Sequence, residues 1–464
     1  MDCGTEQGNR IPLQKKRTNM NQVAEQGGRL SRVGRLLVDQ LAEVTTVLDG
    51  EEVRARYQVE GMFPAVVAVP ATEAEVAACL RVAAAHGAGV CPRGGGTHMG
   101  LGAPPRRCDI VLSLERLAGV VEYVPEDLTV TVQAGMPLAA LEALAAERSQ
   151  EVPLDPMGSG AATVGGILSA GAVGPRRMLY GGPRDVLLGA RVALADGRVI
   201  RSGGRVVKNV AGYDLNKLWV GSLGTLGVLT EVTLKLRPKP ACRRTLYYSF
   251  GDLTEALQAA EAVLGSELLS AAVTLLSPGA AANLGLPEHF GLALELAESE
   301  TNVAYQMDRL EEILTGHAGR PEEVLADGTG ALGPEPGDQF WRDLRDFHRT
   351  SGACWHVRVS TVISDLEELV RLALSTSGVE VIAHVGSGSL FVYGQEPDPR
   401  LVSALQNRAA ALGGAAVLEE APPELKRQVD VWGPPRPEWR LMRQIKERLD
   451  PGGILNPGRF VGGI

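Results

Sequence analysis

The spacing of apolar positions divides the chain near residue 240 into two regions of different character. In the first region, short apolar runs alternate with glycine-rich loops. Residues 63–70 form an apolar run bracketed by prolines, which indicates a strand. Thr72 and Glu75 have the spacing of a capping box, so a helix is predicted from there to about His86. Helical spacing over Val33–Leu48 predicts another helix. Further strands are predicted over residues 89–92, 109–114, 120–124 and 128–132, and a helix over 137–148.

After Ala241 the glycine loops give way to helices and strands that alternate irregularly. Strands are predicted over residues 245–250, 271–276, 291–296, 355–362, 380–384, 390–393 and 416–419, and helices over 254–264, 303–314, 366–375, 400–411 and 438–449. This order is typical of an α+β domain built partly on antiparallel pairs. Residues 319–337 are predicted to form a surface loop.

One predicted helix, over residues 338–349, has a single aromatic face formed by Phe340, Trp341, Leu344 and Phe347. Such a face either packs on the core or docks a partner chain, and we favour the core.

The stretch from Gly158 to Leu236 is the most glycine-rich, with nine glycines between Gly158 and Gly189. It also holds a predicted hairpin, Val186–Leu194 and Arg198–Arg201, turned on Asp196-Gly197. Glycine allows a ligand to approach the main chain closely, so the stretch suggests an extended, phosphate-bearing cofactor. The alternative is a set of tight turns in an ordinary sheet protein.

A second glycine loop, Arg93 to Gly102, follows a predicted strand but lacks the G-x-G-x-x-G spacing and a following helix. It therefore does not predict a dinucleotide-binding Rossmann unit. We expect this loop to hold phosphate with its own N–H groups.

Composition narrows the range of partners. The 464 residues carry a formal net charge of -9 and 4% aromatics, which argues against nucleic acid. No run of about 18 apolar residues occurs, which leaves only peripheral membrane attachment through a partner open. Residues 1–34 are predicted to be a disordered extension without a signal peptide, and Met20 is an alternative start.

The six cysteines are scattered and none forms a C-x-x-C pair, so neither zinc nor an iron–sulfur centre is predicted in this chain. Such sparse cysteine use fits a reducing cytosol.

Four ordered motifs together resemble one known family. They are RGGGTHMGLG from Arg93, TVGG…YGGPRDVLLG from Thr163, NVAGYDLNKLWVGSLGTLGVLTE from Asn209, and the terminal DPGGILNPGR. They resemble the PCMH-type FAD-binding domain of the vanillyl-alcohol oxidase family. The likeness is greatest to the FAD-binding (E-type) subunits of bacterial glycolate oxidases, on the runs Lys208–Asp214 and Ser222–Gly227.

The resemblance implies an α+β fold. An FAD-binding domain of two α+β subdomains would span residues 35–240 and an α+β cap 241–432. The C-terminal segment, 433–464, would return to the FAD site.

The resemblance also implies where FAD would sit. Arg93, Gly94, Gly95, Gly96, Thr97, His98 and Gly100 would wrap the pyrophosphate, and Thr163, Gly165 and Gly166 would approach the phosphates and the ribityl chain. Gly174, Arg176, Gly181 and Asp185 would shape the far wall, and Gly227 and Val228 would lie near the adenine or ribityl end. Some relatives attach the flavin through a histidine where this chain has Thr97. We therefore expect non-covalent FAD, with His98 near phosphate.

A later motif departs from the catalytic relatives. Flavin dehydrogenases for 2-hydroxy acids in the family carry His-x-Gly-Asp-Gly-Asn-Leu-His, and this chain reads HVGSGSLF from His384 to Phe391. The carboxylate and the second histidine are lost, so we assign no metal site and no firm catalytic residue. His384 is either a residual substrate-side group or a strand histidine held by a polar neighbour, which we favour. Arg358 either clamps a carboxylate or is a plain strand arginine.

Three hypotheses for function follow. The first is an FAD-binding subunit of a heteromeric glycolate oxidase, working with a catalytic flavin subunit and an iron–sulfur subunit, in the cytoplasm or at the inner face of the membrane. The second is a self-sufficient FAD-dependent 2-hydroxy-acid dehydrogenase. The third is a non-enzymatic scaffold that has lost the flavin.

Overall fold

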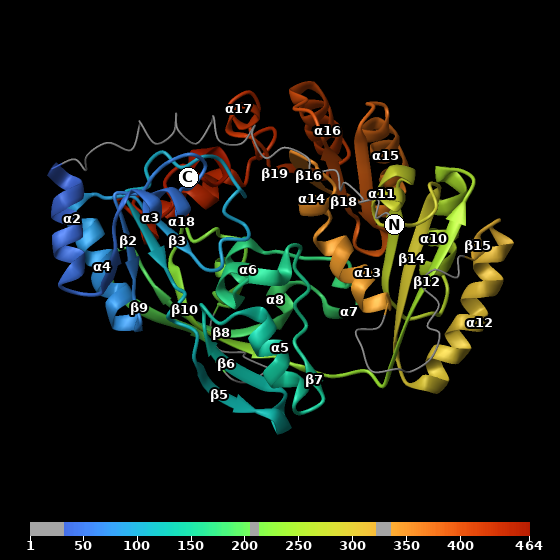
Figure 1. Cartoon of the computed structure of the whole chain (residues 1–464), viewed down its shortest axis with the longest axis horizontal. Coiled ribbons are helices and arrows are strands. Elements are labelled where there is room, and N and C mark those ends of the chain that lie inside the picture. Colours follow the sequence, from blue (N-terminus) through green and yellow to red (C-terminus); the bar gives the residue numbers. More distant parts are fainter. Residues whose placement is uncertain (1–31, 205–212, 322–335) are drawn as a thin grey trace, which may run out of the picture.

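The computed structural model describes residues 32–204, 213–321 and 336–464, and Figure 1 shows their arrangement. The elements up to β10 (Val228–Lys235) lie in one half of the molecule and those from β12 (Cys242–Phe250) to α16 (Pro399–Ala411) in the other, while α18 (Trp439–Leu449) and the end of the chain lie back beside the first half (Figure 1). The α+β prediction is confirmed. Most of the predicted extension at residues 1–34, most of the loop at 319–337 and most of the run Lys208–Asp214 lie outside the described residues, and residues 32–34 already belong to the first described helix.

The first subdomain is a four-stranded sheet of order β1-β2-β4-β3. Its strands are β1 (Thr46–Leu48), β2 (Val66–Val69), β3 (Val90–Arg93) and β4 (Ile110–Ser113). Its helices are α2 (Arg32–Ala42), α3 (Glu51–Arg56) and α4 (Glu73–His86). The Thr72 N-cap is confirmed, because the Thr72 hydroxyl accepts from the Glu75 N–H at the start of α4. The Glu75 carboxylate accepts from the Ala71 N–H at 3.0 Å, one residue before the N–H that a capping box uses.

One predicted boundary in this subdomain is wrong. The helix expected over Val33–Leu48 ends at Ala42, and Thr46–Leu48 is instead the edge strand β1, antiparallel to β2. The run Val44-Thr45-Thr46-Val47 is β-branched throughout, which favours a strand wherever a partner strand is at hand.

The second subdomain is a five-stranded antiparallel sheet of order β5-β6-β10-β8-β9. Its strands are β5 (Val120–Val124), β6 (Thr129–Gln133), β8 (Leu187–Ala193), β9 (Val199–Gly203) and β10 (Val228–Lys235). The helices are α5 (Leu138–Ala146), α6 (Val164–Ala170), α7 (Arg177–Tyr180), α8 (Pro183–Val186) and α9 (Asn216–Trp219), and β7 (Gln150–Glu151) pairs with β11 (Arg237–Pro238). The predicted hairpin is β8–β9, and Gly197 in its turn has φ +80°.

The cap is an eight-stranded antiparallel sheet of order β15-β12-β14-β13-β17-β18-β16-β19. Its strands are β12 (Cys242–Phe250), β13 (Ser270–Leu276), β14 (Phe290–Glu298), β15 (Arg320–Pro321), β16 (Trp355–Ser360), β17 (Val379–His384), β18 (Ser389–Gly394) and β19 (Ala415–Glu420). One face packs on α10 (Leu253–Leu264), α12 (Glu300–Gly316), α15 (Leu366–Leu374) and α16 (Pro399–Ala411). The other face packs on α11 (Pro278–Asn283), α13 (Pro336–Arg345) and α14 (Phe347–Thr350).

The predicted aromatic face belongs to the core of the cap. Phe340, Trp341, Leu344 and Phe347 are all at most 5% exposed, in one cluster with strand residues such as Ile382. The preference for core packing over a partner surface is confirmed.

The end of the chain returns to the first subdomain. After α17 (Pro423–Lys426) and α18 (Trp439–Leu449), the tail runs beside β3, where the Val90 N–H donates to Ile454 O at 2.7 Å and the Asn456 N–H donates to Val90 O at 2.8 Å. This path brings the NPGR sequence next to the first glycine loop.

Candidate functional site

The glycine loop after β3 lies directly on the start of α6. A Cβ at Gly94 would lie 2.0 Å from Thr163 Oγ1, and one at Gly95 would lie 1.5 Å from the carbonyl oxygen of Ala161. A larger residue at Gly94 would displace the Thr163 side chain, and one at Gly95 would displace the main chain, so the glycines are required for this close approach. Thr163 caps α6 by accepting from the Gly166 N–H.

Two adjoining grooves, open to solvent, run along this loop. They enclose about 500 and about 390 Å³ of empty space, solvent included, and share Gly94, Gly166, Ser169 and Leu223. Ten of the predicted cofactor residues line them: Arg93, Gly94, Gly95, Gly96, Thr97, His98, Gly165, Gly166, Gly227 and Val228. Thr163 lies beneath Gly94, and Gly100 lines a neighbouring cavity.

The residues that line these two grooves do not include the four predicted to form a far wall, Gly174, Arg176, Gly181 and Asp185. Gly174 packs against Asp155, and the Asp185 carboxylate accepts from the Gly182 N–H at 2.8 Å. The motif around Arg176 is thus tied to the domain interface rather than to the grooves.

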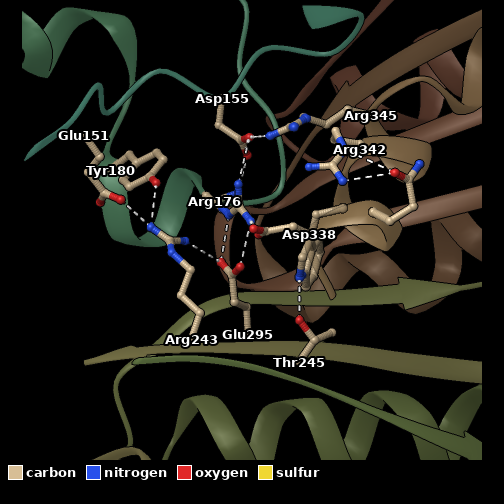
Figure 2. A network of polar contacts seen from close by, with 12 residues as sticks. Glu151, Asp155, Arg176, Tyr180, Arg243, Thr245, Glu295, Asp338, Arg342 and Arg345 are labelled. Atoms are coloured by element: carbon tan, nitrogen blue, oxygen red, sulfur yellow. Dashed lines mark hydrogen bonds and ion pairs between the residues drawn. The ribbon is translucent and has the colours of Figure 1, made fainter. Parts of the chain in front are cut away.

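Arg176 is the centre of a buried ion-pair network between the second subdomain and the cap (Figure 2). Its guanidinium donates to both carboxylate oxygens of Glu295, at 2.7 and 2.8 Å, and Glu295 is 1% exposed. Asp155 accepts from the Arg176 N–H and pairs with Arg345. Arg243 joins Glu295 to Glu151. With both Glu295 oxygens engaged, the guanidinium holds α7 against the cap sheet.

The tail adds two groove residues that the sequence analysis did not assign, Asn456 and Arg459. Arg459 is 2% exposed and its Nη2 donates to Met99 O and Leu101 O, both at 2.6 Å. Its Nε and Nη1, and Oδ1 of Asn456, have no hydrogen-bond partner among the described residues. Buried polar atoms without partners at an open groove indicate a polar ligand. The NPGR sequence after the last helix is the feature of the sequence from which these two residues could have been predicted.

These features fit FAD. Glycine loops leave backbone N–H groups open to a diphosphate, and the spare guanidinium N–H groups of Arg459 match phosphate oxygens. Arg93 to His98, Gly165, Gly166, Gly227, Val228, Asn456 and Arg459 would hold the cofactor.

A further cavity, of about 420 Å³ with solvent included, lies where the glycine loop meets the cap. Thr97, His98 and Gly100 line one side, and the other side is lined by His348 of α14 and by His356, Tyr393 and Glu419 of the cap strands. Glu419 is bonded to Arg358 Nε at 2.6 Å and lies 3.4 Å from His356 Nε2. Burial raises the pKa of Glu419, but Arg358 and His356 outweigh it and hold this pKa well below the usual range.

Arg358, one of the two candidate catalytic residues, is thus already ion-paired with the Glu419 carboxylate of its own chain. Its guanidinium is 24% exposed and also donates to Ser360 Oγ at 3.2 Å. The sequence analysis assigned no role to Glu419 or His356. The two approach each other because β16 and β19 pair side by side. Among the described residues, no group of three or more His, Cys, Asp or Glu side chains is arranged to hold a metal ion.

His384, the other candidate, lies in the core of the cap sheet. It is 1% exposed, its Nδ1 is 3.0 Å from Thr274 Oγ1, and its ring meets Phe391 edge-on at 5.4 Å. Nε2 has no partner in the described part of the chain. Burial lowers the pKa of His384 to about 4.

The buried imidazole predicts a specific loss of stability in acid. The unfolded state takes up a proton near the ordinary pKa of about 6.5, whereas the folded state does so only near 4. Stability is therefore fully present above pH 6.5 and falls by about 3 kcal/mol as the pH drops to 4. Urea unfolding at pH 7 and pH 4.5 should show a smaller loss in His384→Asn than in the unsubstituted chain. An equal loss in both proteins would contradict this assignment.

Comparisons with known proteins agree with an FAD site in the grooves. Residues 64–203 match the FAD binding domain family, and residues 434–460 match the C-terminal domain of FAD linked oxidases. The glycolate oxidase subunit GlcE of Escherichia coli is 30% identical over 74% of this chain and 84% of its own length. GlcD of Bacillus subtilis is 27% identical, covering 87% and 90%. Mitochondrial D-2-hydroxyglutarate dehydrogenase of Bos taurus is 30% identical, covering 84% and 76%.

Among solved structures, p-cresol methylhydroxylase with substrate bound superposes with a TM-score of 0.73 at 16% identity, over 93% of this chain and 97% of that one, which shows a shared fold. No helix among the described residues is long and apolar enough to cross a membrane. The loop grooves, the returning tail and these relatives together establish that the chain belongs to the family of FAD-linked oxidoreductases, with an FAD-binding domain and the C-terminal domain of FAD-linked oxidases.

Proposed function

We propose that this chain is the FAD-binding subunit of a heteromeric 2-hydroxy-acid oxidase that converts glycolate to glyoxylate. A catalytic flavin subunit and an iron–sulfur subunit would complete the assembly. The observation that carries the proposal is the pairing of a preserved FAD groove with an altered catalytic motif, HVGSGSLF. Similarity to both GlcE and GlcD supports glycolate as the substrate of the assembly.

The altered motif lacks the groups that alcohol oxidation needs. Bound FAD would supply a hydride acceptor, and a nearby base must take up the hydroxyl proton. Phe391, in place of the second histidine, has a hydrocarbon ring that neither ligates a metal nor accepts a proton, and it is 1% exposed and stacked with Tyr393. The Ser387 hydroxyl donates to His384 O, within its own turn. His384 is left buried among Thr274 and Phe391.

The scattered cysteines agree with an assembly in which another subunit carries the iron–sulfur cluster. None of the six forms a C-x-x-C pair, and the five in the described residues are free thiols. A cluster that passes electrons onward would then belong to another subunit.

Reconstitution tests the proposed assembly. Co-expression of this chain with the catalytic flavin subunit and the iron–sulfur subunit of the same source should give one complex on gel filtration. Glycolate oxidation should require all three chains, with only background activity when this one is omitted. Full activity of the remaining two subunits, or no association, would overturn the proposal.

A second candidate function is self-sufficient oxidation of a 2-hydroxy acid, and the His356–Glu419 pair favours it. The Glu419 carboxylate orients the imidazole of His356 in a cavity that also touches the glycine loop. Such a pair can accept a hydroxyl proton without the altered motif. Flavin reduction by glycolate in the isolated chain, lost in His356→Asn, would establish this alternative.

A further inference from the structure

Two buried cations from distant parts of the chain hold four consecutive carbonyl groups of the glycine loop. Arg459 Nη2 donates hydrogen bonds to Met99 O and Leu101 O, at 2.6 Å each. Lys426 Nζ binds the other two carbonyl groups: it donates to Gly100 O and lies 3.5 Å from Gly102 O. Lys426 ends α17 in the cap, so this contact ties the cap to the loop.

The charges around this contact do not balance. The Lys426 side chain is fully buried, and its ion-pair partner is Glu60 Oε2 at 2.9 Å. Arg459 is also buried, and no ion pair to its guanidinium is found among the described residues. The next carboxylate, Glu420, is 57% exposed and is screened by solvent. Two cations against one buried carboxylate leave a formal surplus of one positive charge beside the groove.

A buried surplus charge is costly unless a counter-charge reaches it. The adjoining groove is lined by the same loop and by Arg459. A diphosphate there would supply the missing negative charge, at a position where low dielectric makes the attraction strong.

We propose that Lys426 is a positioning residue for FAD. It fixes the loop through the carbonyls of Gly100 and Gly102, and the surplus positive charge that it and Arg459 carry over Glu60 is compensated in full only when the diphosphate is bound. Because α17 belongs to the cap, FAD binding and cap docking then stabilise one another. This inference depends on the FAD groove and not on the substrate or the partner subunits.

Two substitutions that break the same ion pair separate this role from a purely structural one. Lys426→Met removes a cation and should weaken FAD binding by about tenfold or more, since hydrogen bonds to a charged donor are lost together with the attraction. Glu60→Gln removes the competing anion and leaves Lys426 in place, so it should tighten FAD binding several-fold. A purely structural ion pair would make both variants bind more weakly.

The measurement is the dissociation constant of FAD, from quenching of flavin fluorescence on titration into the apoprotein of the full chain. Arg408→Met is the control. It removes a cation of the cap that pairs with Glu368 within the cap and touches neither the loop nor the domain interface, so FAD affinity should change little. Weaker or unchanged binding in Glu60→Gln would overturn the proposal. The FAD affinity of Glu60→Gln tests the proposal even if Lys426→Met does not fold. None of these measurements depends on glycolate turnover.

Discussion

Replacing Gly95 with alanine is expected to weaken FAD binding by about 100-fold and to give a nearly colourless protein. The added Cβ would lie 1.5 Å from the carbonyl oxygen of Ala161, a main-chain atom that cannot move aside like a flexible side chain. The loop must shift away from α6, and the N–H groups that would face the diphosphate shift with it. The ratio of flavin to protein absorbance after purification with excess FAD measures the effect.

Gly160→Ala is the matched control for this prediction. Gly160 precedes Ala161 directly, yet a Cβ there has no atom within 4 Å. Flavin content should therefore equal that of the unsubstituted chain. If both variants keep their flavin, the close approach of loop and helix does not build the cofactor site.

Arg176→Met is expected to lower the free energy of unfolding by about 3–5 kcal/mol. Both oxygens of Glu295 lose their bidentate partner, and this carboxylate is 1% exposed, so its charge stays buried with only Arg243 at 3.4 Å to offset it. The network joins the FAD-binding domain to the cap, so the cap should loosen along with the loss of stability (Figure 2). Urea unfolding followed by circular dichroism, with limited proteolysis of the folded protein, measures both effects.

An exposed ion pair provides the comparison. Arg408 and Glu368 have side chains 42% and 51% exposed, and Arg408→Met should change stability far less than Arg176→Met because solvent screens the pair. If the two substitutions have equal effects, the buried network does not hold the domains together.

The sequence predicts most of the elements because the cap strands and helices carry strong periodicity. The strand expected at residues 245–250 is β12, and the helix expected at 400–411 is α16. The exception, α2 and β1, shows the limit of periodicity. Helical spacing continues past Ala42, but pairing of Thr46 with Val69 decides the structure, and that partner is not visible in a local pattern.

The candidate site was predictable where a motif is contiguous and not where it is assembled from distant strands. The loop from Arg93 to His98 lines the grooves as expected. Arg176 lies in a glycine motif as well, but Glu295 of a cap strand captures its side chain. His356 and Glu419 become neighbours only through the β16–β19 pair. No spacing in the sequence indicates that contact.

The central claim is that this chain binds FAD and leaves glycolate oxidation to a partner subunit. The most direct test is an anaerobic visible spectrum of the purified single chain, loaded with FAD, before and after addition of glycolate. We predict a flavin spectrum that stays oxidised, with no bleaching over many minutes. Bleaching on addition of glycolate would contradict the claim and would make the chain a dehydrogenase by itself, with His356 and Glu419 as the first residues to substitute.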